Sequence, residues 1–217
     1  MSAPGINDDI EICVATTEDG DRLMDFLHVH YYREEPLTAG CEPPEPDEAD
    51  EKFLLSNLPH GSCLLALHKG RIVAAAVAGP KTADEAAHLF EEATHLAGSK
   101  WGRILGILAI AERDANVFKR FNIDRALHLH AIGVDNQLRG RALGERIMNA
   151  LAARGKELGY PLLTVDCTSV YSIRLMKRLG YDLVNTMRYT DYVDATGKQI
   201  ICPPAPHETM ETYALRL

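Results

Sequence analysis

Long apolar runs, a basic excess and paired cysteines are all lacking in this 217-residue sequence. No apolar run is long enough to cross a bilayer, so we expect no membrane-spanning segment and no membrane partner. Lys and Arg number 23 against 31 Asp and Glu, and the formal net charge of −8 argues against a nucleic-acid partner, which needs a basic face. The five cysteines are scattered, odd in number and form no CxxC pair, which predicts reduced thiols and no zinc site.

The first residues, MSAPGINDDIEI, contain no basic segment followed by an apolar one, so they predict no secretory signal. With the reduced thiols, this predicts a cytoplasmic protein. Hydrophobic residues make up 46% and charged residues 25%, which is ordinary for a globular protein. No internal repeat, low-complexity segment or linker divides the chain, so we expect one domain over residues 1–217 and a monomer. The acidic balance mildly favours a cationic small molecule as ligand.

Apolar spacing predicts alternating strands and helices. The expected strands cover 10–17, 126–135, 161–168, a segment from 181 onward and 210–217, with a β-hairpin over 62–80 that turns at "KG". The expected helices cover 18–32, 51–58, 82–97, 101–121, 140–159 and 169–180. The segment 33–50, with four prolines, is expected to be a loop or a broken helix. The pattern predicts an α/β (α+β) fold with a mixed, mostly antiparallel central sheet flanked by helices.

The stretch HLHAIGVDNQLRGRALGERI (128–147) passes from a strand through small residues into a helix. Backbone N–H groups at such a helix start converge on one point, with the positive end of the helix dipole behind them, and can bind a phosphate or diphosphate. Arg139 and Arg141 add positive charge, while Gly140, Ala142 and Gly144 allow a ligand close to the backbone. The turn matches neither the P-loop nor GxGxxG. Taken alone, it is equally compatible with an ordinary, tightly packed helix start.

The two segments VDNQLRGRALGERIMNAL and LLTVDCTSVYSIRLMKRLGYDLV resemble the GNAT superfamily of acyl-CoA-dependent N-acetyltransferases. RGRALG fits the family signature [Q/R]xxGx[G/A] through Arg139, Ala142 and Gly144, although family members more often have Gly where Ala142 stands. The segments YYREEPLTAG, CTSVYS and ICPPAPHETM, in this order, resemble the insect arylalkylamine N-acetyltransferases within that superfamily.

This resemblance implies the GNAT fold, acetyl-CoA as cosubstrate, no metal, and direct attack by an amine in a ternary complex. The implied acceptor is the primary amine of a small arylalkylamine such as dopamine, tyramine, octopamine, serotonin or tryptamine. The strand backbone at Ile132 to Val134 is expected to pair with the pantetheine amides, as an added strand would, with an N–H near Val134 holding the oxyanion. The expected cofactor-binding residues are Ile132, Gly133, Val134, Arg139, Gly140, Arg141, Ala142, Leu143, Gly144 and Ser172.

Amine acetylation requires that an ammonium lose a proton before it attacks the thioester carbonyl. Glu35, fixed beside Pro36, is a candidate for the carboxylate that binds the ammonium and takes this proton, and the resemblance implies the same role. A solvated loop acid is the alternative, and we expect Glu34 to be one.

His128 and His130 lie two residues apart on one strand, so they face the same side and could relay a proton. HLHAIGV is also similar to the His-x-His strand of the vertebrate serotonin N-acetyltransferases, so His130 is predicted to be an accessory base. The alternative is a pair of hydrogen-bonded core histidines. Zinc binding is not expected, because no further ligand is evident nearby.

The acid that protonates the leaving thiolate is less well defined. Many GNAT enzymes carry a Tyr where this sequence has Met176, so Tyr171 and Ser172 are the substitutes considered. Thr168 and Ser172 correspond to two site serines of the insect enzymes, and Thr168 could instead cap the helix that begins near Ser169. The predicted catalytic residues are therefore Glu35, Ser172, Thr168, His130 and Tyr171.

Three alternative functions remain open. The acceptor could be a polyamine or agmatine, which shares only the ammonium with an arylalkylamine. The fold could also sense acetyl-CoA or an amine without turnover, although Glu35 and the CTSVYS hydroxyls argue against a sensor. A protein acetyltransferase is the third alternative, but the long loop after residue 32 and the helices between 82 and 120 indicate a covered, small pocket.

Overall fold

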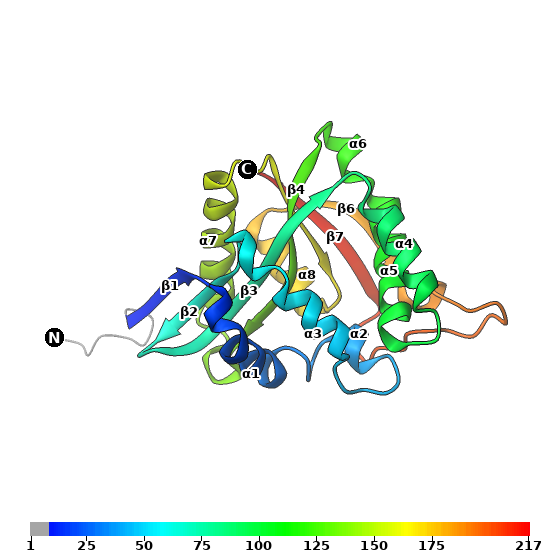
Figure 1. The fold of residues 1–217 in the computed structure, drawn as a ribbon, viewed down its shortest axis with the longest axis horizontal. Helices are drawn as coiled ribbons and strands as arrows, with labels where there is room; N and C mark the ends of the chain where they lie inside the picture. The colour runs from blue at the N-terminus through cyan, green and yellow to red at the C-terminus, as the bar shows by residue number, and fades with distance from the viewer. Residues whose placement is uncertain (1–8) are drawn as a thin grey trace.

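A seven-stranded sheet in the order β1-β2-β3-β4-β5-β7-β6 forms the centre of the computed structural model, which describes residues 9–217 (Figure 1). Residues 1–8, on which the prediction of no secretory signal partly depends, lie outside the described residues. Only β4 and β5 pair in parallel; the other neighbours are antiparallel. The predicted α+β fold, with a mixed, mostly antiparallel sheet flanked by helices, is confirmed.

The sequence order alternates strands and helices as expected. The strands are β1 (Ile10–Val14), β2 (Leu64–His68), β3 (Arg71–Thr82), β4 (Arg125–Val134), β5 (Leu162–Cys167), β6 (Asp182–Arg188) and β7 (Thr209–Arg216). The α-helices are α1 (Gly20–His30), α2 (Pro36–Ala39), α3 (Glu48–Leu55), α4 (Glu85–His95), α5 (Lys100–Ala115), α6 (Val117–Phe121), α7 (Leu143–Glu157) and α8 (Val170–Leu179).

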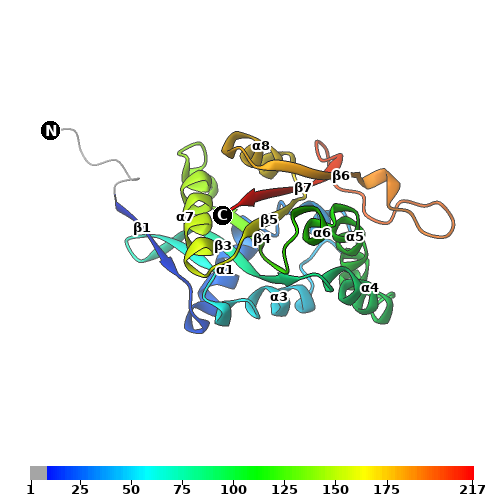
Figure 2. The same ribbon diagram turned by 90° about the horizontal axis from the view of Figure 1, so that it is seen from above.

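The helices form a layer on each face of the sheet (Figure 2). On one face lie α7 and α8, and α7 buries Ile147, Met148 and Leu151 in the core there. On the other face lie α1, α3 and the α4–α5 pair, and α1 buries Leu23 and Leu27. Apolar side chains at helical spacing thus give each layer one face to bury, as expected for amphipathic helices.

Several element boundaries differ from the sequence prediction for identifiable reasons. The helix predicted over 101–121 is two helices, because Asn116 adopts the left-handed conformation (φ 44°) and ends α5. The first strand ends at Val14 instead of residue 17, since Thr16 and Asp19 form a capping box around a 3-10 turn. The region 33–50 contains α2, and α3 begins at Glu48, where the Asp47 carboxylate accepts a hydrogen bond from the Ala49 N–H.

The predicted hairpin turn is confirmed and has the conformation that two-residue hairpins favour. Lys69 and Gly70, which join β2 to β3, both have positive φ, 51° and 75°.

Strand β4 separates from β5 in the middle of the sheet. Its pairing with β5 covers only Leu127–Leu129, whereas its pairing with β3 continues to Val134. The register with β3 passes from Ala131 opposite Val77 to Leu129 opposite Ala78, so His130 is the extra residue of a β-bulge. The bulge and the divergence leave one edge of β4, from Ala131 onward, without β5 as a partner.

Candidate active site

A cavity of about 830 Å³ opens where β4 and β5 diverge, and both helical layers line it. Three arginines and one acid line it on the α7–α8 side, namely Arg139, Arg174, Arg178 and Glu145, while Glu34, Glu35 and Asp50 line it on the α1–α3 side. The cavity is therefore positive toward one layer and negative toward the other, as expected for a site that binds an anion and a cation together.

The turn before α7, where the sequence predicted an anion site, lines the cavity. Gly140 (φ 76°) and Ala142 (φ 59°) are both left-handed, and Ala142 is the N-cap of α7. The first N–H groups of α7 have no partner within the helix, and Leu143 and Gly144 line the cavity. Such a helix start can bind the diphosphate of coenzyme A.

Eight of the ten predicted cofactor-binding residues line the cavity: Ile132, Val134, Arg139, Gly140, Ala142, Leu143, Gly144 and Ser172. Gly133 and Arg141 do not. A Cβ on Gly133 would lie 3.1 Å from Phe26 Cε1, so this glycine serves the packing of α1 on β4. Ile132 and Val134 lie on the open edge of β4, where backbone groups can accept an added extended chain.

Glu35 is buried, with 6% of its surface exposed, and caps the N-terminus of α2. Its Oε2 accepts a hydrogen bond from the Thr38 N–H at 2.6 Å. Its Oε1 is buried without a hydrogen-bond partner among residues 9–217. A cavity-lining carboxylate with one oxygen fixed and the other unpartnered is suited to accept a hydrogen bond, or a proton, from a bound ammonium.

Asp50, in the first turn of α3, is a second carboxylate in the same half of the cavity. Burial and the negative charge of Glu35 raise the pKa of Asp50 to about 7. Asp50 could not be singled out from the sequence, because it stands in PEPDEADE, where five of eight residues are acidic.

Glu34 is not simply a solvated loop acid. Its Oε2 lies 2.7 Å from Arg139 Nη1, and about half of each side chain is exposed. This ion pair joins the loop that carries Glu35 to the predicted cofactor turn.

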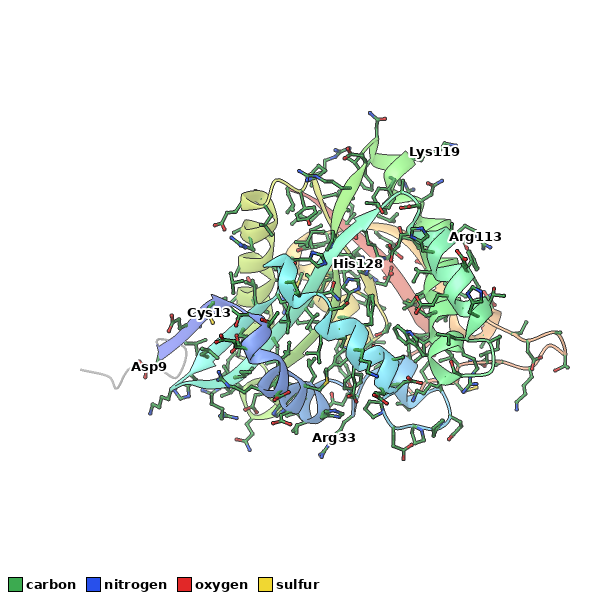
Figure 3. All side chains as sticks on the ribbon, in the orientation of Figure 1. Asp9, Cys13, Arg33, Arg113, Lys119 and His128 are labelled. Carbon is green, nitrogen blue, oxygen red and sulfur yellow. The ribbon has the colours of Figure 1, made fainter. Side chains whose placement is uncertain are left out.

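The two strand histidines share one face of β4, with ring centroids 4.9 Å apart. His128, near the centre of Figure 3, is the hydrogen-bonded core histidine considered as the alternative: its Nδ1 lies 2.8 Å from Thr164 Oγ1 and its Nε2 lies 3.7 Å from Asp166. Burial and the charge of Lys81 lower its pKa well below the usual range.

His130 lines the cavity beside Phe53, with ring centroids 4.9 Å apart, and no hydrogen bond joins its ring to another residue of the described chain. Burial, then the charge of Lys81, lowers its pKa to about 3. The imidazole is therefore neutral at neutral pH and is a weak proton acceptor, whereas Glu35 is the carboxylate with an unpartnered oxygen.

A buried ionic network connects three elements, and one of its members, Asp166, lines the cavity. Lys81 Nζ on β3 lies 2.6 Å from Glu112 Oε2 on α5 and 4.0 Å from Asp166 Oδ2 on β5. Burial alone would lower the pKa of Lys81, but the charges of Glu112 and Asp166 outweigh it and raise this pKa. Thr212 Oγ1 donates to Asp166 Oδ1 at 2.6 Å, so both carboxylates have partners.

The start of α8 places three predicted catalytic residues at the cavity, although not in equal positions. Ser169, not Thr168, caps the helix, and Ser172 forms a capping box with it, its hydroxyl donating to the Ser169 carbonyl at 2.9 Å. Thr168 lines the cavity, and its carbonyl accepts a hydrogen bond from the Tyr189 hydroxyl. Tyr171 also lines the cavity but is 58% exposed. Met176, at the position of the family's usual acid, is buried in the core.

Two cavity residues and one residue beside the cavity gave only indirect signals in the sequence. Arg174 and Arg178 are four residues apart on α8, so they share one helix face toward the cofactor side. His207, within the quoted segment ICPPAPHETM, packs edge-on against Tyr171 with ring centroids 5.7 Å apart. The negative charges of Glu35 and Glu34 act on His207, although burial dominates and lowers its pKa.

No metal site is evident: among residues 9–217, no three or more His, Cys, Asp or Glu side chains are grouped to hold an ion. Within the same range, every helix is too short or too polar to span a bilayer.

Comparisons with known proteins agree with this geometry. The acetyltransferase (GNAT) family matches residues 26–181. An agmatine N-acetyltransferase, solved as a serine-to-alanine mutant in the apo form, is 55% identical, with 97% of this chain and 100% of that chain covered and a TM-score of 0.94. A Drosophila melanogaster polyamine N-acetyltransferase that catalyses the formation of N-acetylagmatine is 56% identical, with coverage of 96% and 100% and a TM-score of 0.93. A mosquito arylalkylamine N-acetyltransferase-like protein, 5b, is 30% identical, with coverage of 96% and 100% and a TM-score of 0.91.

Proposed function

The chain belongs to the acetyltransferase (GNAT) family, whose members use acetyl-CoA as acetyl donor, and on this premise we propose that it acetylates the primary amine of agmatine or a related polyamine. The observation that carries the proposal is a cavity with two carboxylates, Glu35 and Asp50, on the side opposite the predicted coenzyme A turn. Two relatives above 50% identity, which act on agmatine or polyamines, support the same substrate class. The proposal therefore favours the polyamine alternative over the arylalkylamine prediction.

In the proposed mechanism, both substrates occupy the cavity together. The turn from Arg139 to Gly144 holds the diphosphate, and the open edge of β4 at Ile132 and Val134 holds the pantetheine arm. Glu35 Oε1 takes a proton from the ammonium, and the freed amine attacks the thioester carbonyl. The tetrahedral intermediate then expels the coenzyme A thiolate, and its nitrogen loses a second proton as the amide forms. The thiolate takes up one proton and leaves as the thiol, and the other proton is released to solvent from Glu35.

An arylalkylamine is the second candidate, because aromatic side chains line the same half of the cavity. Tyr31, Phe53 and Trp101 offer faces on which either an aromatic ring or a guanidinium could stack. The aromatic lining therefore suits both classes, whereas a second carboxylate is needed only by a dication.

An amine panel tests the proposal. The protein is incubated with acetyl-CoA and agmatine, putrescine, spermidine, tyramine, dopamine or tryptamine, and release of free thiol is followed. We expect kcat/KM for agmatine to exceed that for tyramine by about tenfold or more. A tenfold ratio corresponds to a difference of about 1.4 kcal/mol in transition-state binding. A higher kcat/KM for an aromatic amine would replace the proposal with the second candidate. Binding of acetyl-CoA without turnover of any amine would support a sensor.

A further inference from the structure

Of the three carboxylates in the acidic half of the cavity, Glu34 is paired with Arg139, whereas Glu35 and Asp50 have no salt-bridge partner within residues 9–217. The two nearby lysines have other partners. Lys52 pairs with Glu48 at 2.6 Å. Lys100 donates to the carbonyls of Thr38, Pro43 and Glu45, so it acts on Glu35 only through its charge and not through an ion pair.

We propose that Asp50 determines specificity by binding the distal cation of the substrate, a guanidinium or second ammonium, while Glu35 binds the reacting ammonium. The inference rests on the proposed function and deepens it. It follows from the position of the two carboxylates: Glu35 lies at the start of α2 with an unpartnered buried oxygen, and Asp50 lies on a separate helix, α3, within electrostatic reach. One monoamine can neutralise only one of them.

The repulsion between the two carboxylates gives a dication an advantage over a monoamine. The ionised Asp50 side chain is disfavoured by burial, by the negative charge of Glu35 and by the neighbouring acids Asp47 and Glu51. The phenol of Tyr32, two residues after the end of α1, partly opposes this rise in the pKa of Asp50, and the negative charges of Asp50 and Glu35 both act on the Tyr31 phenol. A bound guanidinium adds an attractive interaction that offsets these unfavourable ones, whereas a neutral group does not.

This arrangement also sets the direction of a pH effect on binding. Because the pKa of Asp50 is raised to about 7, the free protein holds Asp50 increasingly protonated as the pH falls below 7. A guanidinium prefers the ionised form, so the KM for a dication should rise as the pH falls from 8 to 6. The KM for a monocation of the same shape should show this rise much less.

The test compares agmatine with N-(4-aminobutyl)urea, in which a neutral urea replaces the guanidinium at nearly the same shape. Asp50→Asn should raise the KM for agmatine about thirtyfold, with kcat changed less than about threefold, since an isosteric amide removes only the charge. The KM for the urea should change by less than about twofold. The matched control Glu48→Gln, in the same turn of α3 but exposed and paired with Lys52, should alter neither substrate.

If Asp50→Asn changes the KM for both substrates equally, or leaves the KM for agmatine unchanged, the inference is wrong. The proposed function still holds in that case, provided that the wild type acetylates agmatine. Absence of agmatine turnover by the wild type would overturn both. If Asp50→Asn does not fold, the wild type still decides the matter: a KM for agmatine that does not rise relative to that of the urea between pH 8 and pH 6 contradicts the role of Asp50.

Discussion

Glu35 is the residue on which the proposed proton transfer depends, because one of its oxygens is held by the Thr38 N–H and the other has no partner in the described chain. In Glu35→Gln the amide oxygen can still cap α2, but the amide side chain cannot act as a base. We expect kcat to fall by about 10²- to 10⁴-fold, the usual contribution of a general base. The remaining rate should increase toward alkaline pH, where the amine loses its proton without help. Steady-state rates over the neutral and alkaline range measure both effects.

Glu34→Gln is the matched control for this substitution. Glu34 is the adjacent residue, but its side chain is about half exposed and paired with Arg139. The Glu34→Gln variant should therefore keep the kcat of the wild type. A pH–rate profile of Glu35→Gln that coincides with that of the wild type would remove Glu35 from the mechanism.

Ala142 is the residue at which the predicted cofactor turn has a conformational cost. Its φ of 59° is left-handed, which costs an L-residue about 1–2 kcal/mol. Ala142→Gly should remove this cost. The larger conformational entropy of glycine in the unfolded state should destabilise the protein by about 0.5–1 kcal/mol. We therefore expect a net stabilisation of up to about 1 kcal/mol, or about 2–4 °C in Tm.

The same substitution within α7 should have the opposite sign. Ala153 is exposed in the helix interior, so Ala153→Gly should destabilise the protein by about 1 kcal/mol. Thermal unfolding of the two variants measures the difference. Equal shifts of Tm in one direction would show that the left-handed conformation of Ala142 carries no cost.

Single residues of the site were predictable to different degrees. Glu35 stood out because the EEPL segment could be matched to a family, and the position of Pro36 beside it agreed. Asp50 did not, because its neighbours Asp47, Glu48 and Glu51 have the same chemistry and only the packing of α3 distinguishes the acid that lines the cavity. The roles of Ser172 and Thr168 remain predictions, and the capping box now gives Ser172 a structural function as well.

At the scale of secondary-structure elements, Lys81 links β3 to α5 and β5 through Glu112 and Asp166. Lys81→Met would leave two buried carboxylates without their cation, a loss that costs about 3–5 kcal/mol in buried pairs. Burial already raises the pKa of Asp166 above its unfolded value, so ionised Asp166 opposes folding. Without the ammonium this effect increases, and the variant should lose stability as the pH rises.

Urea unfolding at acidic and alkaline pH measures this effect. Lys156→Met, at an exposed position of α7, is the control and should change the free energy of unfolding by less than about 0.5 kcal/mol. A Lys81→Met protein that is as stable as the wild type at alkaline pH would show that the network is dispensable.

Most elements followed from apolar periodicity, but their interruptions did not. The continuous pattern over 101–121 gave no sign that Asn116 breaks the helix, since asparagine occurs both inside helices and at their ends. The bulge at His130 depends on the register between β3 and β4, strands separated by more than forty residues. Sequence spacing correctly placed His128 and His130 on one face, but it did not reveal that β4 and β5 diverge there.

At the scale of the whole molecule, the net charge of −8 does not reveal that two sides of one cavity carry opposite charges. Arg139, Arg174 and Arg178 line the side of α7 and α8, while Glu35 and Asp50 line the other layer. These groups come from segments far apart along the chain, so composition and local pattern could not bring them together. The family segments in the sequence predicted that these residues share one site. In the fold, the cavity between the diverging strands β4 and β5 brings its positive and negative sides together.

The Glu34–Arg139 ion pair joins the proposed amine half of the cavity to the predicted cofactor half. The two side chains are 105 positions apart and their charged atoms 2.7 Å apart. If Arg139 binds the diphosphate, Glu34 competes for the same guanidinium. An exposed ion pair is worth about 1 kcal/mol or less, so Glu34→Gln should lower the KM for acetyl-CoA by up to about fivefold. Arg139→Ala should raise it by about tenfold, because a charge-assisted contact to the anion is lost.

The opposite signs of these two effects distinguish competition from a purely structural role of the pair. If the pair only held the two loops together, both substitutions would weaken acetyl-CoA binding. If Glu34 competes with the diphosphate, Glu34→Gln should have no effect in the Arg139→Ala background, because the guanidinium for which the two anions compete is gone. The gain in Glu34→Gln should also shrink as salt is added, since salt screens the exposed pair. A weaker affinity for acetyl-CoA in Glu34→Gln would contradict the competition and leave the pair as a structural link between the two halves.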